Sequence, residues 1–310
     1  MDGHGQQNMQ MYGQPPIAPE SVKKPGVGKR IGYFFLSLTP AAACLLLQIA
    51  AGAAVMIVGA LIRMVQYMAA HPMATESQLL DAYIAAVYDF MGLGVLAYHV
   101  IALPVFGLWY YFGCKKPKLK QSFRNLNVQA IVIAIAGGVS MCLFSNAMVG
   151  VEQYLLPRAM EDYMELMELA NVGNDWLVTL AAVVLAPIGE EILCRGLTLY
   201  YAKKALPYFW MANILQALLF GVIHGNLIQG LYAFAIGLML GWVTERYHSL
   251  LPAMLLHFTV NFSSTVWIEK AFFWIPDTLL SYLILLGITL FVTLLLVLWG
   301  TVCNKNTVKQ

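Results

Sequence analysis

The sequence PIGEEILCR, residues 187–195, places two adjacent carboxylates, Glu190 and Glu191, close to the guanidinium of Arg195. It lies within residues 176–201, a run that is otherwise apolar enough to cross a bilayer. A charged side chain near the bilayer centre is costly unless it finds partners. Charged groups in such a helix therefore indicate a functional site.

The whole chain is too apolar for a soluble protein. It has 310 residues, of which 60% are hydrophobic and 11% charged, and its mean hydropathy is +0.70. Soluble proteins carry about 25% charged residues. The composition indicates an integral membrane protein in a lipid bilayer, and no nucleic-acid partner is expected. The five cysteines contain no C-x-x-C pair, so neither a disulfide framework nor a thiolate metal site is predicted.

Apolar runs recur along the chain. A spanning helix needs roughly 20 mostly apolar residues, and about eight runs approach that length. They lack the period-2 alternation of a barrel strand, which favours helices. The predicted fold is therefore all-α, a polytopic membrane protein with about eight transmembrane helices. The predicted spans are residues 31–62, 85–112, 128–151, 176–201, 207–224, 227–243, 250–267 and 278–302.

Basic residues set the predicted orientation, because cytoplasmic loops are enriched in Lys and Arg. They precede the first span, follow the second, fourth and sixth spans, and close the chain. Both termini of this multi-pass protein are therefore expected on the cytoplasmic side of the cell membrane. The acidic segment between the third and fourth spans has apolar spacing that predicts an amphipathic helix on the outer side.

The spans divide the chain into five parts. An inverted-repeat transporter would show matching broken helices in both halves, whereas here the intramembrane polar residues concentrate between Glu190 and Asn261. The predicted parts are a disordered cytoplasmic tail (1–30), N-terminal transmembrane helices (31–151), an extracytoplasmic amphipathic loop (152–175), a catalytic core (176–268), and a last helix with a short cytoplasmic tail (269–310).

The charged stretch suggests two different roles for its two glutamates. Pro187 removes a backbone hydrogen bond, so a kink is expected just before the carboxylates. Glu191 and Arg195 are four residues apart on one helical face, with the acid first, which favours an ion pair. Glu190 has no such local partner and is the first candidate for chemistry.

Two histidines and an asparagine are expected at a similar depth. His224 follows Phe220 by four residues at the end of one span, and His257 and Asn261 share a face of another. A partly desolvated carboxylate is a better base, and a histidine beside it can orient a water molecule. A second histidine and a carboxamide can donate to an oxyanion. Together with Glu190, this set fits amide hydrolysis without a covalent intermediate.

Three motifs in order, EExxxR at 190–195, FxxxH at 220–224 and HxxxN at 257–261, resemble the CAAX prenyl protease and bacteriocin-processing (CPBP, or Abi) family of intramembrane endopeptidases. The resemblance covers about residues 176–267. It implies that Glu190 and His224 activate water while His257 and Asn261 stabilise the oxyanion. The candidate catalytic residues are Glu190, Glu191, His224, His257 and Asn261, with Arg195 and Phe220 in support.

The expected substrate is a peptide bond in a membrane-associated chain or a C-terminally prenylated (CAAX) protein. The catalytic cavity is predicted among the helices of the C-terminal half, opening toward the cytoplasm. Two other functions stay open: a membrane transporter or ion path lined by the same polar groups, and a non-catalytic bacteriocin-immunity or scaffold protein that binds peptides in the membrane.

Metal dependence also stays open on the residues alone. Glu190, His224 and His257 match the donor set of a catalytic zinc site. The resemblance favours a metal-free, glutamate-dependent mechanism, so no obligatory cofactor is predicted and zinc is the alternative.

Other intramembrane polar residues stand alone in apolar runs and are predicted to hydrogen-bond between helices. These are Gln48, His99, Asn146, Asn213 and Gln216.

The predicted depths of His224 and His257 in the membrane conflict with each other. His224 lies about seventeen residues, roughly 25 Å, from the inner end of its span, and His257 only about seven residues, roughly 10 Å. The two histidines can meet only if their helices begin at different depths, and we expect the span of His224 to begin outside the bilayer core.

Overall fold

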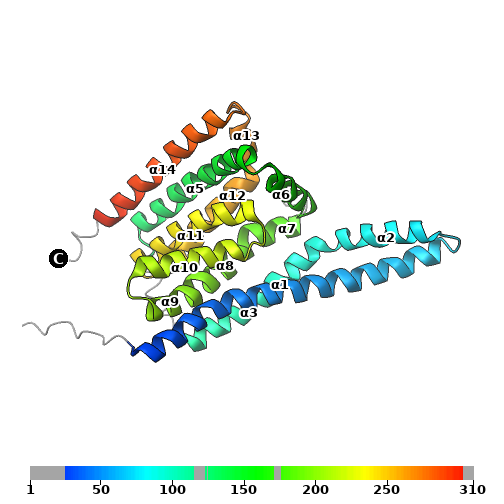
Figure 1. Cartoon of the computed structure of the whole chain (residues 1–310), viewed down its shortest axis with the longest axis horizontal. Helices are drawn as coiled ribbons and strands as arrows, with labels where there is room; N and C mark the ends of the chain where they lie inside the picture. Colours follow the sequence, from blue (N-terminus) through cyan, green and yellow to red (C-terminus); the bar gives the residue numbers. More distant parts are fainter. Residues whose placement is uncertain (1–24, 115–122, 124, 171–175, 303–310) are drawn as a thin grey trace, which may run out of the picture.

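The computed structural model describes residues 25–114, 123, 125–170 and 176–302, and its regular elements are all helices (Figure 1). Most of the predicted N-terminal tail and the last residues of the chain lie outside the described residues. The helices are α1 (Val27–Ala70), α2 (Glu76–Asp89), α3 (Met91–Gly113), α5 (Val128–Leu155), α6 (Pro157–Ala170), α7 (Trp176–Leu180), α8 (Ala186–Glu191), α9 (Leu199–Ala205), α10 (Phe209–Val222), α11 (Leu227–Tyr247), α12 (Leu251–Val266), α13 (Ile268–Phe272) and α14 (Leu279–Val302).

Six helical stretches of the described residues are long and apolar enough to cross a membrane by length and composition. They are Val27–Ala70, Glu76–Gly113, Val128–Leu155, Trp176–Ala205, Leu227–Tyr247 and Leu279–Val302. The two remaining predicted spans correspond to shorter helices, α10 with 14 residues and α12 with 16. The all-helical, multi-pass prediction is confirmed, while two of the eight predicted spans are shorter than a full crossing.

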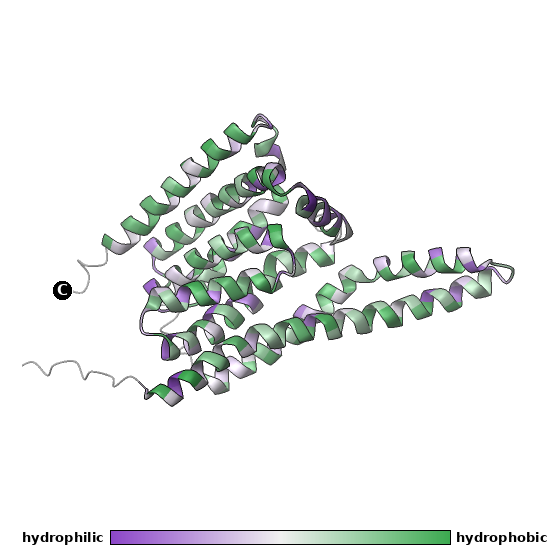
Figure 2. Cartoon of the chain, in the orientation of Figure 1, coloured by the Kyte–Doolittle hydropathy of each residue, from purple (hydrophilic) through white to green (hydrophobic). Residues whose placement is uncertain are grey.

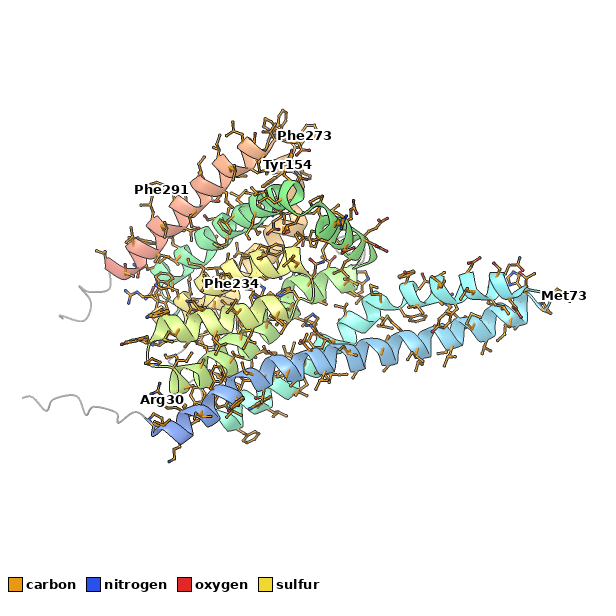
Figure 3. The ribbon with its side chains drawn as sticks, in the orientation of Figure 1. Arg30, Met73, Tyr154, Phe234, Phe273 and Phe291 are labelled. Atoms are coloured by element: carbon orange, nitrogen blue, oxygen red, sulfur yellow. The ribbon has the colours of Figure 1, made fainter. Side chains whose placement is uncertain are left out.

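The first helix is much longer than its predicted span. The span was expected to end at residue 62, but α1 has 44 residues, which is about 66 Å at the rise of an α-helix. Thr75 then caps α2 through a capping box with Gln78. The far part of α1 and α2 form an antiparallel arm that extends beyond the bundle (Figure 1). Met73 lies at the tip of this arm, and Arg30 lies at the other end of α1, beside the bundle (Figure 3).

One end of the bundle gathers basic side chains. Arg30 Nε donates to the carbonyl oxygen of Ala205 at 2.9 Å, which joins the start of α1 to the end of α9. Arg246 Nε donates to the carbonyl oxygen of Gly300 at 2.7 Å, which joins α11 to α14. Lys203 pairs with Glu245 at the same end. The described basic residues next to the predicted cytoplasmic segments therefore meet at one end, while residues 115–122 and 124 of the loop after the second predicted span lie outside the described residues.

The acidic segment forms a helix at the other end. The predicted outer amphipathic helix corresponds to α6, the most hydrophilic of the helices (Figure 2). It begins later than the predicted loop, because α5 continues to Leu155 and includes Glu152.

Two glycines let α10 and α11 cross closely: a Cβ on Gly221 would lie 2.6 Å from the carbonyl oxygen of Gly230. This crossing adjoins the charged stretch and sets the position of the end of α10.

Candidate functional site

The charged stretch lies on a helix with two wide turns. Residues 181–185 and 192–198 are π-helical, and α8 lies between them. The sequence predicts a kink before the carboxylates, and the helix instead widens on both sides of them. Such π-bulges are frequent at functional sites. The first wide turn contains Ala182, whose carbonyl oxygen accepts a hydrogen bond from Asn261 Nδ2 at 2.8 Å.

Glu191 connects three helices from a fully buried position. Its Oε1 accepts a hydrogen bond from Arg195 at 2.7 Å and contacts His257 Nδ1 at 2.9 Å. Neither Glu191 nor Arg195 has an exposed side chain. The predicted ion pair is therefore present, and it also holds the ring of His257.

The guanidinium of Arg195 has further partners. It donates to the carbonyl oxygen of Gly237 at 3.2 Å and lies over the ring of Phe220, 4.5 Å from its centroid. Phe220 is 2% exposed. A buried charge is tolerated only when such partners replace water. Arg195 and Phe220 therefore pack α10 and α11 around the charged stretch.

The hydrogen-bond partners of the two histidines determine which ring nitrogen carries the proton. A carboxylate and a backbone carbonyl only accept hydrogen bonds, so the nitrogen facing them carries the proton. His257 Nδ1 faces Glu191, and His224 Nδ1 faces the carbonyl oxygen of Phe220 at 2.6 Å. The Nε2 atom of each ring is thereby left for other partners, and His257 Nε2 lies 3.7 Å from Glu190 Oε2.

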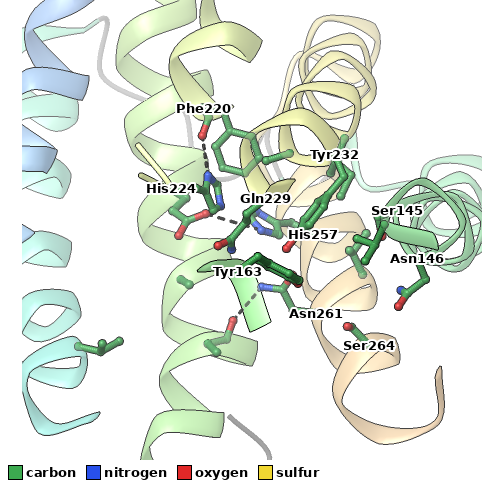
Figure 4. A pocket seen from close by; sticks show the side chains of 18 of the residues that line it. Ser145, Asn146, Tyr163, Phe220, His224, Gln229, Tyr232, His257, Asn261 and Ser264 are labelled. Carbon is green, nitrogen blue, oxygen red and sulfur yellow. Dashed lines mark hydrogen bonds and ion pairs between the residues drawn. The ribbon is translucent and has the colours of Figure 1, made fainter. Parts of the chain in front are cut away.

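Four predicted residues line one cavity of about 260 Å³ (Figure 4). They are Glu190 on α8, His224 just after α10, and His257 and Asn261 one turn apart on α12. Phe220 lines the cavity as well. Glu191, predicted to be catalytic, does not line it and instead lies behind His257. The predicted pairing of Glu191 with Arg195 is confirmed, while its predicted catalytic role stays a prediction.

Several lining residues were not predicted as part of a site. His99 from α3 and Asn146 from α5 were assigned to interhelical packing, yet both line the cavity. Tyr163 from α6 and Tyr232 from α11 also line it. Each is a single polar residue without motif spacing, so only the packing of helices brings it to the cavity. The packing role predicted for Asn213 and Gln216 is confirmed, since they donate to carbonyl oxygens of Leu238 and Gly237.

The depth conflict is resolved by the ends of the helices. The start of α12 lies beside the charged helix at Gly196, where an added Cβ would be 3.5 Å from Leu250 Cδ1. The start of α10 lies farther along the same helix, toward its C-terminal end, where Ala212 packs with Ala202 of α9. The two helices therefore begin at different levels, and His224 and His257 reach the same cavity.

The cavity lies nearer the α6 end of the bundle than the basic end. The charged helix contributes residues between Val178 and Glu190, in its first half, and α12 contributes residues up to Ser264. Tyr163 of α6 lies over the same space (Figure 4). Arg30 and the other described basic side chains lie at the opposite end. With that end taken as cytoplasmic, the position of the cavity conflicts with the expected opening toward the cytoplasm, and the orientation stays a prediction.

A metal site was tested against the donor geometry. Within the described residues, no group of three His, Cys, Asp or Glu side chains is arranged to hold a metal ion. Both histidines already use Nδ1 in internal contacts. The zinc alternative, with Glu190, His224 and His257, gains no geometric support, and metal-free chemistry stays a prediction.

The helices and the buried charged cluster define an integral membrane protein with an enclosed polar site. Residues 172–263 match the family model described as type II CAAX prenyl endopeptidase, Rce1-like. This segment is therefore an Rce1-like domain of the CPBP family, a family of hydrolases. The predicted family is confirmed. The match leaves the helices before residue 172, and α13 and α14, outside it. No curated protein and no solved structure matches the chain.

Proposed function

We propose that the chain is an intramembrane endopeptidase that hydrolyses a peptide bond of a membrane-associated or C-terminally prenylated chain with water activated by Glu190. One observation carries the proposal: Glu190, His224, His257 and Asn261 line a single cavity of about 260 Å³. The family match supports proteolysis as the reaction.

In the proposed first step, Glu190 takes one proton from a water molecule. The other hydrogen of that water is donated to His224 Nε2, which orients the water. The water oxygen attacks the carbonyl carbon of the scissile bond, and the carbonyl oxygen becomes an oxyanion. His257 Nε2 and the second N–H of Asn261 Nδ2 are the donors to that oxyanion, since the first N–H is held by Ala182. Each such donor contributes about 10²–10³ in rate.

In the second step, protonated Glu190 passes its proton to the leaving nitrogen as the carbon–nitrogen bond breaks. The products are a carboxylic acid and an amine, so the atoms of one water are accounted for. Donation by His257 Nε2 requires the imidazolium form. Glu191 lies at Nδ1 and Glu190 at Nε2 of this ring, at 2.9 Å and 3.7 Å.

Glu191 and Arg195 act as positioning residues in this proposal. They do not line the cavity, and Glu191 instead orients His257. Under the positive-inside orientation, the cavity lies toward the extracytoplasmic side, where α6 is expected. A substrate segment would then approach from that side or laterally from the bilayer.

The test is cleavage by the purified, detergent-solubilised chain of a farnesylated CAAX peptide and its unprenylated twin, each beside Glu190→Gln. We expect cleavage by the wild type and a loss of about 10²–10⁴ in kcat with Glu190→Gln, while the unfolding temperature changes little. Glu245→Gln, at the opposite end of the bundle, is the matched control. Undiminished cleavage by Glu190→Gln would exclude this mechanism, and cleavage of only the farnesylated peptide would establish a prenylated substrate.

A further inference from the structure

Glu152 is a buried carboxylate that the proposed reaction does not use. It is 4% exposed, and neither of its carboxylate oxygens has a hydrogen-bond partner among the described residues. A carboxylate buried without a partner costs several kcal/mol of solvation. A cationic ligand from outside the folded chain would offset this cost.

Glu152 lies on the cavity side of α5. Ser145 and Val149 line the cavity, and Glu152 is the next residue on the same face at helical spacing. It lies about one turn beyond Val149 toward the α6 end, next to the cavity lining but not part of it.

Two tyrosines of the cavity lining lie near Glu152. Tyr163 of α6 and Tyr232 of α11 line the cavity and are hydrogen-bonded to each other. Both are close enough to Glu152 to feel its charge. Burial raises the pKa of the Tyr163 phenol, so it stays uncharged. A carboxylate beside two aromatic rings is a favourable setting for a cation.

The charges of α6 also favour a cation at this end. Its exposed side chains include Glu161, Asp162, Glu165 and Glu168, and acidic surfaces raise the local concentration of cationic ligands. The basic residue of α6, Arg158, is exposed and forms no ion pair with Glu152 in the described part of the chain. Among the residues that the structure describes, no cationic side chain bonds to the Glu152 carboxylate.

We propose that Glu152, Tyr163 and Tyr232 form a substrate subsite that binds a Lys or Arg side chain of the peptide near the scissile bond. This inference rests on the proposed endopeptidase function and adds a sequence preference to it. The substrate side chain would enter from the α6 end and pair with Glu152 behind the two tyrosines. Its binding would fix which peptide bond reaches Glu190.

The experiment measures binding separately from cleavage. Fluorescent peptides with Lys, Arg, norleucine or Glu at each of four positions on either side of the cleaved bond are titrated against the Glu190→Gln protein. Where no cleavage is known, the same substitutions are scanned along the CAAX peptide. At one position, Lys and Arg should bind about tenfold or more tightly than norleucine, the effect of one charge-assisted hydrogen bond.

The Glu152→Gln substitution in the same background should reduce that ratio to about one, and Glu245→Gln should leave it unchanged. Equal binding of Lys and norleucine peptides to the parent protein would overturn the subsite, whether or not Glu152→Gln folds. A preference for Lys that survives Glu152→Gln would also overturn it. Because binding is the readout, a failure of the subsite is distinguishable from a failure of the proposed hydrolysis, which would appear only as missing turnover.

Discussion

Replacing Glu191 with glutamine tests whether this buried carboxylate positions His257. The substitution keeps the shape of the side chain but removes its charge. Glu191 Oε1 accepts hydrogen bonds from Arg195 at 2.7 Å and from His257 Nδ1 at 2.9 Å. In the variant, a neutral carboxamide must take the place of the carboxylate that accepts from both donors. Arg195, 3% exposed, would keep its charge without a counterion.

Two magnitudes follow from that geometry. Breaking a buried ion pair on one side costs about 3–5 kcal/mol of folding free energy. Losing the carboxylate that orients a catalytic histidine lowers kcat by up to about 10⁴, and we expect a loss of about 10²–10⁴ here.

The assays are denaturation in detergent and kcat and KM on a cleaved peptide, for Glu191→Gln, Arg195→Met and the double variant. The double variant should be more stable than Glu191→Gln alone, because it leaves no unpaired guanidinium. It should remain as inactive, because His257 still lacks its carboxylate. Full activity of the double variant, or wild-type kcat in Glu191→Gln, would refute the positioning role of Glu191.

Three further predictions concern packing, metal and orientation. Gly221→Ala should lower the free energy of unfolding by about 1–3 kcal/mol and reduce cleavage, because its Cβ would meet Gly230; Gly287→Ala, with open space around it, is the matched control, and equal stability of the two variants would contradict the close crossing. Dialysis against a chelator should leave cleavage unchanged, whereas a loss restored only by added Zn²⁺ would support the zinc alternative. In intact cells, an impermeant maleimide should label Glu165→Cys but not Lys203→Cys, and the reverse pattern would place the cavity on the cytoplasmic side.

The local contacts of the charged stretch were predictable from sequence because helix geometry alone determines them. Residues four apart share a face, so Glu191 was placed beside Arg195 and His224 just after Phe220 without knowledge of the fold. The apolar runs likewise predicted an all-helical membrane protein, and the acidic spacing after residue 152 predicted α6. The length of α1 was missed because polar residues after residue 62 end the apolar run but do not end the helix.

The assembly of the site was decided by tertiary structure. Glu191 and His257 are 66 positions apart, and their contact depends on where α12 begins relative to the charged helix. His99, Asn146 and Glu152 carry no motif, since each is one polar residue in an apolar helix, and only the rotation of that helix decides whether it faces the cavity or a neighbour. The sequence by itself determined the class of protein, the family and the residues of the three motifs. The depths and crossings of the helices decided which of these residues face the cavity and at which end of the bundle the cavity lies. The physical reason is that contacts between helices depend on packing, which no local spacing encodes.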